Sequence, residues 1–239
     1  MSQRLVEYVP GQIWFSQYSV HFAGMDIYSR MTVIRLSDES LLLHSPCDID
    51  NQMKHSIEQI GNVAHIVAPG SYHYLHLVSA QQAFPEAQTY ICPGVERKRP
   101  SLDFDWILAN RAPAVWDEDL AQVLVRGTRF IWEVAFFHKP SKTLVLVDLV
   151  ENIGDRTEGV GWGLKFWWKV VFRMWNSAKP APEYRMGWKD KKAAKRSLER
   201  ILQWDFERVI LAHGDLIEAN AKAIVREAWV SPLLGAQDV

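Results

Sequence analysis

Three segments of the chain place side chains that can bind a metal ion just beyond, or at the end of, a stretch expected to be a buried strand. Imidazole nitrogens and carboxylate oxygens suit Zn(II), with Fe and Mn as alternatives, and three such ligands already form an open, catalytic type of site. Strands hold the ends of the following loops rigidly, which favours functional groups there. The candidate ligands are His73 and His76, Asp148, and His213.

Each of these signals is weak by itself. A lone histidine is more often a structural residue than a ligand, and two histidines spaced three apart arise readily by chance. An aspartate after an apolar strand often caps a helix or forms a turn. The order and placement of all three segments together favour a divalent metal site, with zinc as the first expectation.

The elements that would position these residues form two groups of strands with helices between them. Patterns of β-branched and aromatic residues predict strands over 12–20, 30–36, 40–44, 62–68, 87–91 and 208–212, and a hairpin of 130–137 with 143–150. Helical spacing and capping residues predict helices over 50–61, 72–84, 117–122, 190–203 and 216–229. The alternation predicts one α/β (α+β) domain over residues 1–239, with helices packed outside sheet layers.

Composition sets the class of protein. The chain has 239 residues, of which 48% are hydrophobic and 23% charged, which excludes a disordered tail, a collagen-like fibre and a disulfide-stapled miniprotein. Cys47 and Cys92 lie far apart and form no Cys-x-x-Cys motif, as in reduced proteins. The first twelve residues carry charge and proline where a signal peptide would be apolar, and no apolar run would span a bilayer. We therefore expect a cytoplasmic protein without a transmembrane segment.

The order of the candidate ligands resembles the metallo-β-lactamase superfamily. The resemblance implies a four-layer αβ/βα sandwich with the metal site at strand ends on one edge, and it extends from about residue 12 to residue 229. In this family a strand ends at His-x-His-x-Asp-His, which residues 71–76 match at His73 and His76. Asp148 matches the aspartate that bridges two metals, and His213 matches the final histidine. The segments RMTVIRL, LLLHSP, FFHKPSKTL and ILAHGD look like an uncharacterised branch that carries only a domain-of-unknown-function label.

Two departures from the family motif reduce the implied site. Ser71 stands where the motif has its first histidine, and Leu75 replaces the aspartate that binds metal and orients the attacking hydroxide. One metal is therefore expected rather than two, with His76, Asp148 and His213 as ligands and His73 in support or at a weak second site. The sequence does not match the family's mid-chain histidine clearly.

Two residues are candidates to replace that mid-chain histidine. Glu133 interrupts an apolar strand, so it is either a ligand, an ion-pair partner or a residue on a solvent-facing side of the strand. His138 lies in the predicted hairpin turn and is expected to be exposed unless it binds metal. His44 ends a strand and is a candidate to support a ligand. The remaining histidines, assigned to structure or solvent, are His21, His55 and His65.

A basic, aromatic segment over residues 162–175 stands apart from this site. Residues 161–209 hold 12 Lys and Arg against 5 Asp and Glu, although the whole chain has a net charge of −1. Lys165, Lys169 and Arg173 recur every four residues between tryptophans. The segment is interpreted as a core helix with a solvated edge, as a lid or homodimer contact, or as a peripheral membrane helix. No nucleic acid is expected, because the basic residues near 190 form a solvated helix face and no recognised nucleic-acid motif is present.

These observations predict a metal-dependent, hydrolase-like enzyme with a mononuclear site. The substrate is an unknown small molecule, which the basic segment suggests is anionic. The alternative is a non-catalytic binding or interaction protein on a degenerate metallo-β-lactamase fold, which the changes at Ser71 and Leu75 favour.

Overall fold

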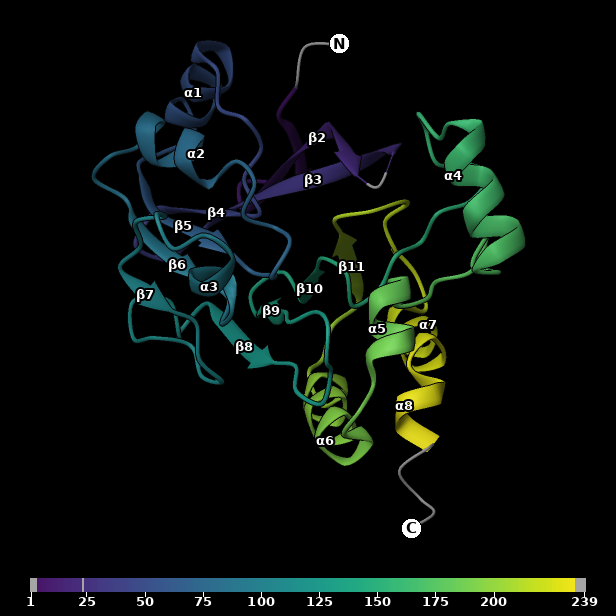
Figure 1. Cartoon of the computed structure of the whole chain (residues 1–239). Helices are drawn as coiled ribbons and strands as arrows, with labels where there is room; N and C mark the ends of the chain where they lie inside the picture. Colours follow the sequence, from purple (N-terminus) through teal and green to yellow (C-terminus); the bar gives the residue numbers. More distant parts are fainter. Residues whose placement is uncertain (1–3, 23, 235–239) are drawn as a thin grey trace.

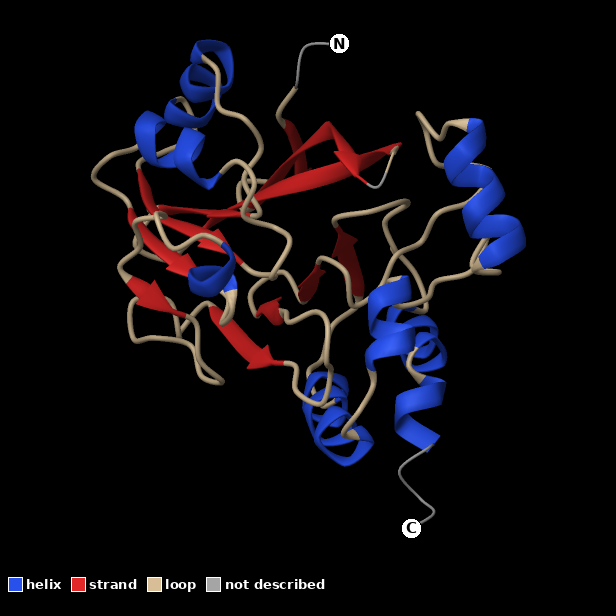
Figure 2. Ribbon diagram, in the orientation of Figure 1, coloured by secondary structure: helices blue, strands red, loops and turns tan. Residues whose placement is uncertain are grey.

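A computed structural model describes residues 4–22 and 24–234 of the chain, so the ends of the predicted domain at 1–3 and 235–239 lie outside the described residues. Two β-sheets lie at the centre, and most helices cover their outer sides (Figures 1 and 2). No helix in the described part of the chain is long and apolar enough to cross a membrane. Cys47 and Cys92 are both free and buried.

The larger sheet has seven strands in the order β1 to β7. The first four strands are antiparallel neighbours, and β4 to β7 pair in parallel. Its strands are β1 (Val6–Val9), β2 (Ile13–Phe22), β3 (Met25–Arg35), β4 (Leu41–His44), β5 (Val63–Ala68), β6 (Gln88–Ile91) and β7 (Trp106–Ile107).

The smaller sheet has four strands in the order β11-β10-β9-β8. β10 pairs in parallel with β11 and antiparallel with β9, so the predicted hairpin is present. Its strands are β8 (Leu120–Leu124), β9 (Val134–His138), β10 (Thr143–Leu146) and β11 (Arg208–Leu211).

The helices differ in length and place. Those near the larger sheet are α1 (Asn51–Glu58), α2 (Leu77–Ala83) and α3 (Val95–Lys98). Those in the second half of the chain are α4 (Trp162–Phe166), the π-helix η1 (Trp167–Val171), α5 (Pro182–Gly187), α6 (Lys191–Leu202), α7 (Ala221–Ala228) and α8 (Val230–Leu234).

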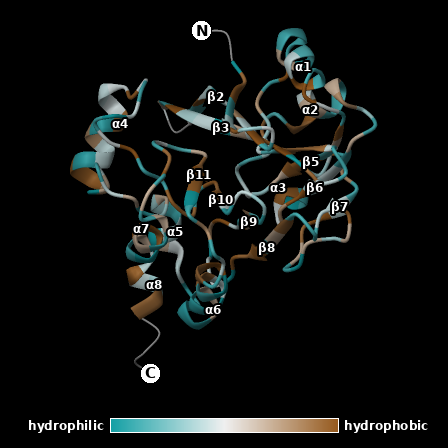
Figure 3. Cartoon of the chain, turned by 180° about the vertical axis from the view of Figure 1, so that it is seen from behind, coloured by the Kyte–Doolittle hydropathy of each residue, from teal (hydrophilic) through white to brown (hydrophobic). Residues whose placement is uncertain are grey.

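Alternation along the strands of the small sheet explains the layered arrangement. Successive side chains of a strand point to opposite faces of its sheet. Phe136 and Val145 belong to the core shared with the larger sheet and α1 and α2, whereas Phe137 and Leu144 belong to the core shared with α6 and α7. In Figure 3 the strand β8 is brown, or hydrophobic, whereas the outer helices α1 and α6 carry many teal, hydrophilic residues. The chain therefore has the predicted sandwich of two sheets between helices.

Aspartates cap the start of two predicted helices, and the sequence had indicated the first of them, Asp50, as a cap. The Asp50 side chain accepts a hydrogen bond from the backbone N–H of Met53 at 2.7 Å at the start of α1. The Asp190 side chain accepts from Ala193 N–H at 2.9 Å at the start of α6. Both bonds satisfy a backbone donor that lacks a partner within the helix.

The helix predicted over 117–122 is wrong. The chain turns there and continues as β8, which pairs antiparallel with β9 from Leu120 opposite His138 to Leu124 opposite Val134. The apolar residues of this stretch gain more by closing the edge of the small sheet than local helical spacing provides. Tertiary pairing has overridden a weak local pattern.

Candidate metal centre

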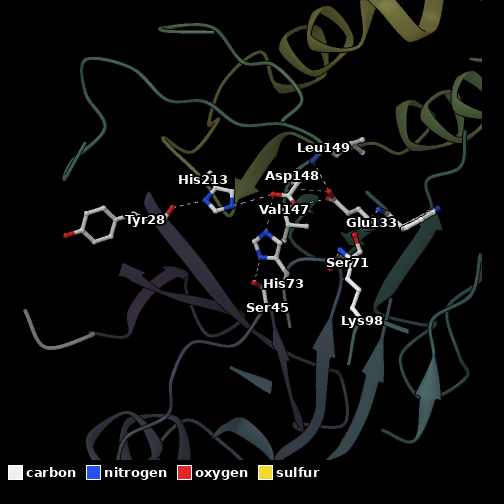
Figure 4. A network of polar contacts seen from close by, with 11 residues as sticks. Tyr28, Ser45, Ser71, His73, Lys98, Glu133, Val147, Asp148, Leu149 and His213 are labelled. Carbon is white, nitrogen blue, oxygen red and sulfur yellow. Dashed lines mark hydrogen bonds and ion pairs between the residues drawn. The ribbon is translucent and has the colours of Figure 1, made fainter. Parts of the chain in front are cut away.

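Three of the predicted ligands converge at the edge where the two sheets meet. His73 lies in the turn after β5, Asp148 follows β10, and His213 follows β11. Their ligand atoms all lie within 4.8 Å of one another, and all three side chains are buried. Both Nε2 atoms face the same Oδ1 of Asp148, at 3.2 Å from His73 and 3.5 Å from His213 (Figure 4).

Contacts behind the two imidazoles fix which nitrogen points toward Asp148. Nδ1 of His213 lies 2.9 Å from the carbonyl oxygen of Tyr28, which can only accept, so this nitrogen carries a proton and donates it. Nδ1 of His73 lies 2.8 Å from Oγ of Ser45. Both rings thus turn Nε2 toward the carboxylate, which is the arrangement that outer contacts give to metal-binding histidines.

The buried carboxylate of Asp148 needs a positive charge beside it, from a protonated imidazole or from a bound cation. Burial opposes ionisation of Asp148, yet the charges and hydrogen bonds of His73 and His213 hold its pKa well below the usual range. Burial likewise opposes a charge on His213. Its hydrogen bond to Asp148, the negative charges of Asp148 and Glu151, and its bond to the Tyr28 carbonyl together outweigh this effect and raise the imidazole pKa. Either protons or a cation can satisfy these groups.

An unsatisfied oxygen favours the cation. Oδ2 of Asp148 is buried and has no hydrogen-bond partner among the described residues. Buried polar atoms are nearly always paired, so an orphaned carboxylate oxygen beside two directed imidazoles is unusual. The donor set and this free oxygen fit a divalent ion with nitrogen and oxygen ligands.

Glu133 positions the segment that carries Asp148. Its fully buried carboxylate accepts hydrogen bonds from the backbone N–H groups of Val147, Asp148 and Leu149, at 2.8, 2.9 and 2.7 Å. Burial raises the pKa of Glu133 to about 8, and these three bonds act in the opposite direction. The side chain is therefore turned to the backbone behind the cluster, and it faces neither solvent nor the Nε2 atoms.

Ser71 and Leu75 occupy the two positions where the family motif has ligands, and they lie in contrasting surroundings. Ser71 is fully buried: its N–H donates to the Trp132 carbonyl at 2.8 Å, and its Oγ accepts from Trp132 N–H at 3.1 Å. Lys98 donates to its carbonyl oxygen at 2.8 Å. Leu75 is half exposed and lines the cavity described below. The serine thus joins two loops, and the leucine makes the cavity wall apolar.

The other predicted site residues lie outside the cluster. His76 stands at the N-cap position of α2 without a side-chain capping bond, and its ring packs edge-on against Tyr18 at 5.3 Å between centroids. His138 pairs with Thr143 at the start of β10, whereas Asp148 follows the end of that strand. A separation of five residues along a strand is roughly 16 Å. His138 is also buried, so the exposed turn expected for it is wrong.

Sequence patterns missed Ser45, which supports His73. The residue before it, His44, was the expected supporting residue, but its fully buried ring packs edge-on against Phe136, and burial lowers its pKa to about 3. The alternation of strand β4 turns His44 away, and a left-handed backbone at Ser45, with φ of 54°, redirects the chain toward His73. The sequence offered one sign of this role, which is that Ser45 directly follows the strand β4.

A cavity of about 400 Å³ adjoins the cluster. His73, Asp148 and His213 line it together with mainly apolar side chains from β2 and β3, from the loop after β5 and from residues 168–186. The lining also contains Glu151 and Glu183 and includes no lysine or arginine among the described residues. Burial raises the pKa of Glu151 to about 8 and also raises that of Glu183. The cavity thus offers no fixed cation to an anionic substrate.

Comparison with solved structures identifies the fold. A crystal structure of the DIM-1 metallo-β-lactamase exposed to ceftazidime is 14% identical, with 99% of each chain covered and a TM-score of 0.65. The metallo-β-lactamase from Pontibacter korlensis is 12% identical, with coverage of 99% and 100% and a TM-score of 0.64. The FIM-1 enzyme from Pseudomonas aeruginosa in its mono-zinc form is 11% identical, with coverage of 98% and 97% and a TM-score of 0.66. The chain has the fold of metallo-β-lactamases.

Sequence comparison defines the family more narrowly. The chain belongs to the family described as Domain of unknown function (DUF4336), whose profile matches residues 10–161. The matched stretch contains His73 and Asp148 and ends before His213. No curated protein matches the sequence.

Proposed function

We propose that this protein is a metal-dependent hydrolase that binds one divalent ion through His73, Asp148 and His213. Zinc is the first choice for this ion. The observation that carries the proposal is the convergence of two imidazole Nε2 atoms on a buried carboxylate that has a free oxygen. A bound metal of this kind supplies Lewis acidity and lowers the pKa of its water toward neutrality. His76, which the sequence placed among the ligands, has no part in this set.

The protein's own residues would prepare the site in three ways. The Tyr28 carbonyl and Ser45 hold the imidazoles with Nε2 directed inward. Glu133 holds the backbone at Asp148. The apolar cavity wall, which includes Leu75, keeps water away from a bound substrate. A substrate that fits this lining is a neutral small molecule with apolar groups, so we propose this class in place of the anionic one.

Metal content measured by elemental analysis of tag-free protein tests the proposal. About one zinc, iron or manganese per chain is expected in the wild type after reconstitution, and His213→Ala should lose it. His76→Ala is the matched control, because it removes a partly buried histidine three residues from His73 that lies outside the cluster. It should retain the metal. Micromolar metal should also raise the Tm of the wild type and the control by mass action, and leave that of His213→Ala unchanged.

A binding protein on a degenerate catalytic fold is the second candidate function. The observation that favours it is the use of Ser71 as a structural link, since this position contributes a metal ligand in the family motif. Without the aspartate replaced by Leu75, no carboxylate orients a metal-bound hydroxide from that position. Absence of metal after reconstitution, together with a Tm that metal does not change, would favour this candidate over the hydrolase.

A further inference from the structure

The helical segment over residues 162–172 has an inner face that belongs to the protein core. Leu164 and Trp168 are buried and form a small cluster with Met174. Met25 and Ile27 of β3 pack against this cluster. The segment therefore rests on the outer end of the β2–β3 hairpin, at the edge of the molecule (Figure 1). These contacts hold it in place and fix which side chains point outward.

The outer face of the same segment is unusually apolar for a surface. Trp162 is 87% exposed, which leaves almost the whole indole in solvent. Four further large apolar side chains within the next nine residues are also exposed. They are Phe166, Trp167, Val170 and Val171. Single exposed apolar residues are ordinary, but a group of this size on one short segment marks an interaction surface.

Cations lie among these apolar side chains. Lys165, Lys169 and Arg173 are all exposed. Lys165 reaches Asp155 only at 4.0 Å, and the other two form no ion pair within 4 Å in the described part of the chain. The sequence has no acidic residue between Glu158 and Glu183. The surface therefore keeps positive charge that Asp155 offsets only in part.

We propose that this segment docks on an anionic lipid membrane. Tryptophan and phenylalanine insert at the boundary between headgroups and acyl chains, while lysine and arginine beside them attract anionic headgroups. A second copy of the chain fits the surface less well. A twofold contact would bring the same three cations face to face, where like charges repel.

The position of the segment connects this surface with the cavity. Trp168 and Phe172 line the cavity, whereas Trp167 and Val171 face outward. Docking would bring the lipid surface to within one helix thickness of a mainly apolar cavity. The inference goes beyond the proposed hydrolase and does not depend on metal binding, so either can fail without the other.

Co-sedimentation of the full chain with vesicles tests the docking. Vesicles of phosphatidylcholine with about one-third phosphatidylserine should bind the wild type, and vesicles of phosphatidylcholine alone should bind it far more weakly. Each cation near such a surface contributes roughly fivefold to the partition coefficient. Lys165→Glu with Lys169→Glu should therefore lower partitioning at least about 25-fold. Trp162→Ser with Val170→Ser should also weaken it, because both residues are exposed and their loss leaves the core intact.

A charge-matched variant separates local docking from overall charge. Lys192→Glu with Arg196→Glu makes the same charge change on an exposed face of α6, and should alter partitioning by less than about twofold. Equal melting temperatures would show that all variants are folded. The proposal would be overturned if the wild type bound equally well to vesicles with and without phosphatidylserine. It would also be overturned if the two charge variants lost vesicle binding to the same extent. A dimer in light scattering that the 165/169 variant dissociates would overturn it too, since the surface would then be a self-contact.

Discussion

Glu133 is the residue on which the placement of Asp148 depends most directly. Its two carboxylate oxygens accept three consecutive backbone N–H groups, a number that a neutral amide side chain cannot match. In Glu133→Gln one oxygen becomes an NH₂ group, so at least one of these N–H groups would face a donor. An unsatisfied buried donor costs about 1–3 kcal/mol. Because the pKa of Glu133 is about 8, the contrast with the amide applies where the carboxyl is ionised, so above pH 8 we expect a loss of unfolding free energy in this range, together with weaker metal binding.

Urea unfolding and a metal titration of Glu133→Gln would measure both effects. Glu118→Gln is the control, because Glu118 is exposed and the same chemical change should cost less than about 0.5 kcal/mol. A Glu133→Gln protein with wild-type stability and wild-type metal affinity would contradict the positioning role. Loss of stability with unchanged metal affinity would limit that role to folding.

At the scale of single residues, the candidate metal ligands could be predicted from the sequence more readily than the groups that orient those ligands by hydrogen bonds. His73, Asp148 and His213 each follow a strand, and the topology of a sandwich brings such strand ends together. His76 follows the same strand as His73, but its direction depends on the turn at 71–76, which spacing does not determine. The Tyr28 carbonyl has no sequence signal at all, because any residue supplies a carbonyl. Its role is visible only once β3 is seen to pass behind His213.

At the scale of elements, β3 anchors the loop that carries His213. Arg30 of this strand is buried and donates hydrogen bonds to the carbonyl oxygens of Leu211 and Gly214, on either side of His213. Burial lowers the pKa of Arg30 to about 10, so the side chain stays charged at neutral pH and its bonds are charge-assisted. The strand of one sheet thus fixes a ligand loop of the other.

Gly214 lets this loop approach the segment after Asp148. Its φ is +87°, and a Cβ at this position would lie 2.2 Å from the carbonyl oxygen of Asn152. In Gly214→Ala the left-handed backbone costs about 1–2 kcal/mol, and relief of the overlap costs a further 1–3 kcal/mol. Because the clash displaces the loop itself, metal binding at His213 should weaken as well.

Gly11→Ala provides the matched control for Gly214→Ala. Gly11 also has a positive φ, of +68°, but a Cβ there would meet nothing within 4 Å. Chemical denaturation should therefore show only the conformational cost for Gly11→Ala and a clearly larger cost for Gly214→Ala. Equal losses in the two variants would mean that the approach to Asn152 is not tight in solution.

Helices and strands with a clear local sequence pattern were predicted correctly. Those that form only because a neighbouring strand pairs with them were not. α6 has a capping aspartate, a single apolar face and a clear end, so 190–203 was predicted within about one residue at each end. β8 has no such signal, and it exists because β9 provides a partner. The π-helix η1 was also missed. Its i→i+5 hydrogen bonds change the angle between successive side chains, but the sequence pattern still has ordinary helical spacing.

At the scale of the whole molecule, the sandwich buries histidines that cannot be charged where they lie. His138 is 1% exposed at the end of β9, and burial lowers its pKa to about 4, with nearby Asp119 acting in the opposite direction. The unfolded chain would take up this proton near pH 6.5, whereas the folded chain resists it down to about 4. Its contribution to stability is therefore complete above pH 6.5 and is lost as the pH falls toward 4.

A comparison of wild type with His138→Asn isolates this effect. Buried Glu151, whose pKa is raised to about 8, contributes the opposite pH dependence, but it is common to both proteins and cancels in their difference. Asparagine can keep the hydrogen bond that Nδ1 forms with Ser141 Oγ at 2.6 Å. Urea unfolding at several pH values should show the advantage of the wild type shrinking by about 1.4 kcal/mol per pH unit between 6.5 and 4. A difference that stays constant over this range would mean that His138 titrates in the folded protein as it does in the unfolded chain.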